Sequence, residues 1–123
     1  MTVIATSAGT WRAAEGIARG ARPDALVLTS GILSPESGSA SSNVESILGS
    51  PSALPPTLVI HHRYDGCLTR PAGVEPFIKW AGGRARVSWL LGGAHEGNPC
   101  NADAYHGFNG LDAQVVELAT GFH

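Results

Sequence analysis

Positive charge is scarce in this chain of 123 residues. Only one Lys and seven Arg occur, scattered singly, and the formal net charge is −2 at pH 7. A protein that follows a phosphate backbone needs basic side chains gathered in a patch or stripe. We therefore expect no nucleic acid partner.

Long apolar runs and paired cysteines are also missing. No run approaches the roughly 20 residues that cross a bilayer, and the N-terminus lacks a charged region followed by an apolar stretch, so we expect no membrane partner. Cys67 and Cys100 are too few for a disulfide scaffold and lack the paired spacing of a structural zinc site. Two cysteines can still form one bridge in an oxidising compartment, so the localisation stays open.

The length is ordinary for one domain and sufficient to bury a core, so residues 1–123 are expected to form a single domain. Short apolar runs bounded by turn residues predict strands at Thr2–Ala5, Ala25–Ser30, Thr57–His61 and Arg86–Leu91. Helical spacing of apolar residues predicts helices at Gly9–Arg19, Asn43–Leu48, Val74–Ala81 and Leu111–Thr120. The second helix is preceded by Ser42, which has capping-box spacing to Glu45.

Strands of the buried type that alternate with helices are typical of a parallel sheet. The expected fold class is α/β, a three-layer sandwich with a mostly parallel four-stranded sheet. Ligands of such sheets gather at the C-terminal ends of the strands. Those ends carry Ser7, Ser30, the segment 61–67 and the loop 95–106, which places the polar chemistry at one edge.

Ser7 is the first candidate nucleophile. It follows the first strand between small residues, as on the sharp strand-to-helix turn that exposes a reactive serine, although Ala5 stands where that motif has its first Gly. Asp65 comes after a later strand, and a His follows it in the chain order Ser, Asp, His. Taken alone, Asp65 is better explained as the turn residue of an Asp-Gly pair.

Two histidines compete for the role of base. His95 comes just after the fourth strand, and His106 lies near the start of the last helix. Asp65 and one of these could instead form a metal pair with His61 or His62, but no spacing of the H-E-x-x-H kind occurs, so no metal or other cofactor is expected. His61 and His62 are interpreted as packing and hydrogen-bonding residues at the end of a strand.

The segments "VIATSAGTWRAA", "PPTLVIHHRYDGC" and "NPCNADAYHGFNGLDAQVV", in this order, resemble the C-terminal half of an α/β-hydrolase. The similarity is greatest to a subset of serine hydrolases with HHRxDGC and PC…HGF motifs. It implies a triad of Ser7 as nucleophile, Asp65 as acid and, through the HGF match, His106 as base, with His95 in reserve. It also implies a disulfide between Cys67 and Cys100.

The resemblance further implies the hydrolysis of small carboxylic esters through an acyl-enzyme, without a cofactor. The backbone N–H of Ala8, at the start of a helix, would hold the developing oxyanion. Short-chain esters are the expected substrates.

An α/β-hydrolase has further strands before the one that carries the nucleophile, and a loop after one of them gives a second oxyanion donor. The sequence is therefore interpreted as a truncated α/β-hydrolase fold. The alternative function is a non-catalytic fragment or interaction module without a complete oxyanion hole. An uncovered edge at Thr2–Ala5 would favour a homodimer formed through that strand.

Overall fold

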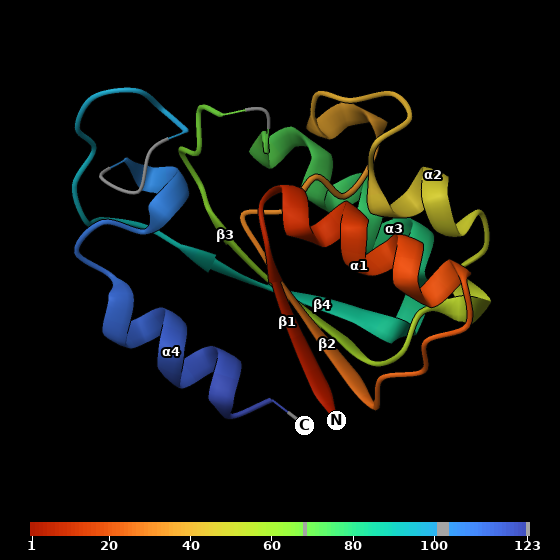
Figure 1. Cartoon of the computed structure of the whole chain (residues 1–123). Helices are drawn as coiled ribbons and strands as arrows, with labels where there is room; N and C mark the ends of the chain where they lie inside the picture. Colours follow the sequence, from red (N-terminus) through yellow and green to blue (C-terminus); the bar gives the residue numbers. More distant parts are fainter. Residues whose placement is uncertain (68, 101–103, 123) are drawn as a thin grey trace.

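A parallel sheet forms the centre of the computed structural model, which describes residues 1–67, 69–100 and 104–122 (Figure 1). Its strands lie in the order of the sequence, and every neighbouring pair is parallel. They are β1 (Thr2–Thr6), β2 (Ala25–Thr29), β3 (Thr57–His62) and β4 (Ala85–Leu90). The predicted α/β class is confirmed, and the sheet is parallel throughout.

The two central strands are the most deeply buried ones. Every residue of β2 and β3 is buried, because each strand has a neighbour on both sides and helices over both faces. The edge strands β1 and β4 are only partly buried. Complete burial of the strand, which in β3 includes Thr57, His61 and His62, therefore marks the sheet centre in this chain.

Helices cover both faces of the sheet (Figure 1). One core joins the strands to α1 (Ala8–Ala18), α2 (Val44–Leu48) and α3 (Val74–Ala81), and a second core joins them to α4 (Asp112–Thr120). Successive residues of β2 serve opposite cores, with Leu26 and Leu28 in the first and Val27 in the second. No helix in the described ranges is both long and apolar enough to cross a bilayer.

The sequence predicted the bounds of all these strands and helices to within one residue. The predicted N-cap of α2, Ser42, was wrong. Asn43, rather than Ser42, is the capping residue, and its side-chain oxygen accepts a hydrogen bond from the Ser46 N–H at 2.8 Å. Asn caps a helix as well as Ser does. The Asn43 amide also donates to the Ser39 carbonyl at 2.9 Å, so both ends of the side-chain amide are bonded.

Candidate active site

Three predicted site residues meet at the C-terminal edge of the sheet. Ser7 follows β1, Asp65 lies in the loop after β3, and His106 lies in a 3-10 turn, Tyr105–Gly107, ahead of α4. The Ser7 Oγ is 3.0 Å from the His106 Nε2, although the two residues are 99 positions apart. The His106 Nδ1 is 3.0 Å from the Asp65 Oδ2. The fold thus joins the three side chains in one line of hydrogen bonds.

Ser7 has an unusual backbone conformation, with φ 55° and ψ −123°. A positive φ at a residue other than Gly costs on the order of 1–3 kcal/mol and persists only where the surroundings enforce it. Here the Ser7 N–H donates to the Thr29 carbonyl at 2.9 Å, and the Ser7 carbonyl accepts from the Thr10 N–H at 3.0 Å and the Thr10 hydroxyl at 2.7 Å. These bonds hold Ser7 at the sharp turn between β1 and α1.

His106 is held from its backbone as well as from its ring. The hydroxyl of Ser30, fully buried at the end of β2, donates to the His106 carbonyl at 2.5 Å. The His106 side chain is 9% exposed. The residue that follows β2 therefore helps to fix the position of the His106 backbone.

Asp65 is 3% exposed and accepts three hydrogen bonds. The Cys67 N–H donates to Oδ1 at 3.0 Å, while the Thr69 hydroxyl and the His106 ring bond to Oδ2 at 2.6 and 3.0 Å. Burial raises the pKa of Asp65, but the bonds from His106, Thr69 and Cys67 together lower it more, so that the pKa lies below its ordinary value. Asp65 is a carboxylate at neutral pH.

This charge determines where the imidazole proton lies. A carboxylate only accepts hydrogen bonds, so the Nδ1 of His106, which faces Asp65, carries the hydrogen. The Nε2 then has a free lone pair directed at the Ser7 hydroxyl. His106 can take a proton from Ser7 in this tautomer.

The disulfide between Cys67 and Cys100 is confirmed, with the two Cα atoms 4.8 Å apart. It ties the loop that carries Asp65 to the segment that leads to His106. A Cβ atom added at Gly66, beside the bridge, would lie 3.5 Å from the Cβ of Pro99. The bridge therefore joins the two loops whose side chains meet in the site.

His95 lies apart from these contacts. It is exposed, and its ring is 5.0 Å from the ring of Tyr105. Within the described ranges it makes no hydrogen bond to Ser7 or Asp65. His106, and not His95, lies between Ser7 and Asp65.

His61 and His62 are packing and hydrogen-bonding residues at the strand end, as predicted. The His62 Nε2 lies 2.8 Å from the Gly92 carbonyl, and its Nδ1 accepts from the Tyr64 N–H at 3.0 Å. The His61 Nε2 lies 2.5 Å from the Thr69 carbonyl. A carbonyl only accepts, so both rings donate through Nε2.

Ala8 is the first residue of α1. Its N–H belongs to the first turn, whose donors have no partner inside the helix and lie at the positive end of the helix dipole. Its role as an oxyanion donor stays a prediction.

Thr69 is the site residue that sequence reasoning missed. It lies four residues after Asp65, and its hydroxyl contacts both Asp65 and His106. No motif marks it, because its contacts arise only when the loop after β3 folds back on itself.

One cavity lies beside the site, with a volume of about 330 Å³. It is lined by Thr6, Thr29, His106, Gly107, Phe108, Asp112, Val115 and Val116. Most of these side chains are apolar or present a methyl group. The cavity lies between the ends of β1 and β2 and the helix α4.

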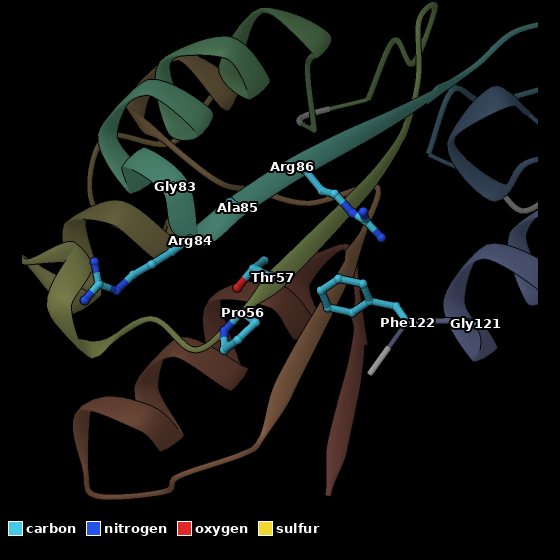
Figure 2. Close-up of a pocket in the computed structure, with 8 residues that line it drawn as sticks. All are labelled: Pro56, Thr57, Gly83, Arg84, Ala85, Arg86, Gly121 and Phe122. Atoms are coloured by element: carbon cyan, nitrogen blue, oxygen red, sulfur yellow. The ribbon is translucent and has the colours of Figure 1, made fainter.

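Another cavity of about 320 Å³ lies where β3 and β4 begin, at the opposite edge of the sheet (Figure 2). Arg84 and Arg86 line it, but their side chains point to opposite sides (Figure 2). The Arg86 guanidinium lies 5.2 Å from the centre of the Phe122 ring. The two positive charges therefore do not converge on a common ligand.

Among the described residues, no group of three or more His, Cys, Asp or Glu side chains is placed to hold a metal ion. In comparisons with known proteins, no family model, curated protein or solved structure matches this chain. The function is therefore inferred from the geometry of the site, and membership of the α/β-hydrolases stays a prediction.

Proposed function

We propose that this protein is a serine hydrolase of small carboxylic esters. The observation that carries the proposal is the line of hydrogen bonds from the Ser7 Oγ through His106 to Asp65, with both links 3.0 Å long. A nucleophile, a base and an orienting acid in this arrangement are the parts needed for acyl transfer. The strained backbone of Ser7 supports the same assignment, since such strain is concentrated at functional sites.

The first half of the reaction forms an acyl-enzyme. The Ser7 Oγ attacks the ester carbonyl carbon while its proton passes to the His106 Nε2, and Asp65 stabilises the resulting imidazolium. The carbon–oxygen bond to the alcohol then breaks, and His106 returns the proton to the departing alkoxide. The products of this half are an alcohol and an ester on Ser7.

Water completes the cycle. His106 removes a proton from a water molecule, whose oxygen attacks the acyl carbon, and the bond to the Ser7 Oγ breaks as the serine regains its proton. A carboxylic acid leaves and the starting state is restored. No step needs a cofactor.

The Ala8 N–H supplies one donor for the oxyanion in this proposal. Loss of one donor from an oxyanion hole costs about 100- to 1000-fold in turnover. A site that relies on Ala8 alone would be correspondingly slow.

Short-chain esters are the proposed substrates. The cavity beside His106, at about 330 Å³, lies near the lower end of the roughly 300–1,000 Å³ range of small-molecule sites. Its apolar lining fits a short acyl or alcohol group better than a charged one.

The order of the site residues supports assignment of the sheet to the α/β-hydrolase fold. The nucleophile follows one strand, the acid follows a later strand, and the histidine precedes the last helix, which is the chain order of that fold. This assignment is part of the proposal.

Hydrolysis of p-nitrophenyl acetate tests the proposed function through three variants. Ser7→Ala and His106→Ala should each abolish turnover to a similar extent, because triad members act as a unit. His95→Ala is the matched control and should retain most of the activity. Full activity in His106→Ala together with none in His95→Ala would show that the base was assigned wrongly.

A further inference from the structure

A second hydroxyl lies inside the proposed triad. Thr69 is fully buried, and its Oγ1 is 2.6 Å from the Asp65 Oδ2 and 2.8 Å from the His106 Nδ1. These two atoms of Asp65 and His106 are themselves 3.0 Å apart. The three groups therefore form a closed ring of contacts.

The single proton of the Thr69 hydroxyl can be assigned. Asp65 is a carboxylate and accepts only, so the Thr69 proton points to Oδ2. A lone pair of the Thr69 oxygen is then left to accept from the His106 Nδ1–H. That N–H is consequently shared between two acceptors, the carboxylate and the hydroxyl.

Thr69 is itself held by a buried histidine. The His61 Nε2–H donates to the Thr69 carbonyl at 2.5 Å and lies 3.7 Å from the Asp65 Oδ2. His61 is fully buried at the end of β3, and burial lowers its pKa despite the nearby Asp65, which keeps the ring neutral at neutral pH. Thr69 is thereby anchored to a central strand of the sheet.

This anchor leaves one polar atom unpaired. Within the described part of the chain, the Nδ1 of His61 has no hydrogen-bond partner. A buried polar atom without a hydrogen-bond partner is unfavourable. An apolar side chain at position 61 would pack without an unpaired polar atom. The hydrogen bond to the Thr69 carbonyl, by contrast, requires a donor at position 61.

We propose that Thr69 is a positioning residue, held by His61, that keeps the Asp65 carboxylate and the His106 imidazole aligned while His106 accepts the proton of Ser7. A hydrogen bond gains strength when its donor becomes charged, so the Thr69 oxygen stabilises the imidazolium more than the neutral ring. The bond from the Thr69 hydroxyl also restrains rotation of the carboxylate. Since this role rests on the proposed function, its test needs a readout that does not depend on turnover.

The kinetic test compares Thr69→Val, which loses the hydroxyl at nearly constant volume, with Thr69→Ser, which keeps it. A hydrogen bond to a charged group corresponds to about a 10- to 100-fold effect, so kcat for p-nitrophenyl acetate should fall by that factor in Thr69→Val with KM little changed. Thr69→Ser should restore most of the rate. Equal rates in wild type and Thr69→Val would overturn the proposal.

Proton NMR of the resting protein gives the second readout. The resonance of the His106 Nδ1–H should shift and exchange faster with water in Thr69→Val, and should remain near its wild-type position in Thr69→Ser. An unchanged resonance in Thr69→Val would overturn the proposal even if the wild type hydrolyses no ester. Absence of turnover in the wild type itself would instead refute the proposed function.

A folding control accompanies both readouts. Near-ultraviolet circular dichroism should be the same for wild type and variants. If Thr69→Val does not fold, Thr69→Ala takes its place, because it removes the hydroxyl without adding an atom, and the same two outcomes decide the proposal.

Discussion

Asp65 is buried and accepts three hydrogen bonds. Burial raises its pKa, but these bonds lower it by more. The donors come from the backbone of Cys67, the hydroxyl of Thr69 and the ring of His106. All three favour the charged form. The consequence reaches beyond the site, because a shifted pKa also links the folding equilibrium to pH.

The direction in which the pKa of Asp65 is shifted determines how folding stability depends on pH. The pKa of Asp65 is lower in the folded protein than in the unfolded chain, so its contribution to stability is complete above the unfolded pKa and is lost as the pH falls through the folded pKa. Asp65→Asn should remove this contribution. The free energy of unfolding of the wild type should therefore fall more steeply than that of the variant once the pH falls through the ordinary aspartate pKa of about 3.9. Urea titrations at a series of pH values measure the free energy of unfolding of both proteins. The same pH dependence in wild type and Asp65→Asn would contradict this prediction.

The sequence predicted some residues of the candidate site and missed others. Ser7, Asp65 and His106 follow strand ends or precede a helix in a chain order that can be read directly, and the resemblance distinguished His106 from His95. Thr69 could not be found in this way. Its hydroxyl has a partner only because the disulfide loop closes and His61 anchors its carbonyl.

The elements themselves were predictable because their signals are local. Each strand is a short run rich in apolar residues between turn residues, and the helices have apolar residues at helical spacing. The cap of α2 was missed because Ser42 and Asn43 are both good caps and adjacent in sequence. The bond from the Asn43 amide to the Ser39 carbonyl, which depends on the fold of the preceding turn, distinguishes them.

The helix α4 forms one wall of the cavity beside His106. Val116 lines that cavity and is 60% exposed, so a larger side chain can enter the space without displacing the core. Val116→Trp should lower kcat/KM for p-nitrophenyl butyrate about tenfold more than for the acetate.

The matched control is Val116→Ala, which enlarges the same cavity and should not disfavour the longer ester. Steady-state kinetics with both esters measures the ratio. If Val116→Trp lowers kcat/KM for both esters by the same factor, the cavity does not hold the acyl group.

The strand β1 lies at one edge of the sheet. It bonds to β2 along one side, and Ile4 is 53% exposed. The strand contains no Lys, Pro or other residue that discourages edge-to-edge pairing. We propose that a second copy of the chain pairs with this edge in a two-fold dimer.

Sedimentation velocity over a concentration series tests the dimer. The wild type should be dimeric at about tens of micromolar, and Ile4→Lys should be monomeric because the dimer would bring two like charges together. Leu91→Lys, which places the same charge at another exposed apolar residue, should leave the dimer intact. A wild type that remains monomeric throughout the series would rule the dimer out.

Whether Ser7 is a nucleophile activated by His106 is tested most directly by a fluorophosphonate probe, which forms a bond between phosphorus and an activated serine oxygen as fluoride leaves. Mass spectrometry of the folded wild type should find one adduct per chain, on the peptide that contains Ser7. The adduct should be absent from Ser7→Ala and His106→Ala and present in His95→Ala. Folded wild-type protein that remains unlabelled while a known serine hydrolase in the same tube reacts, or that is labelled at another serine, would contradict the account.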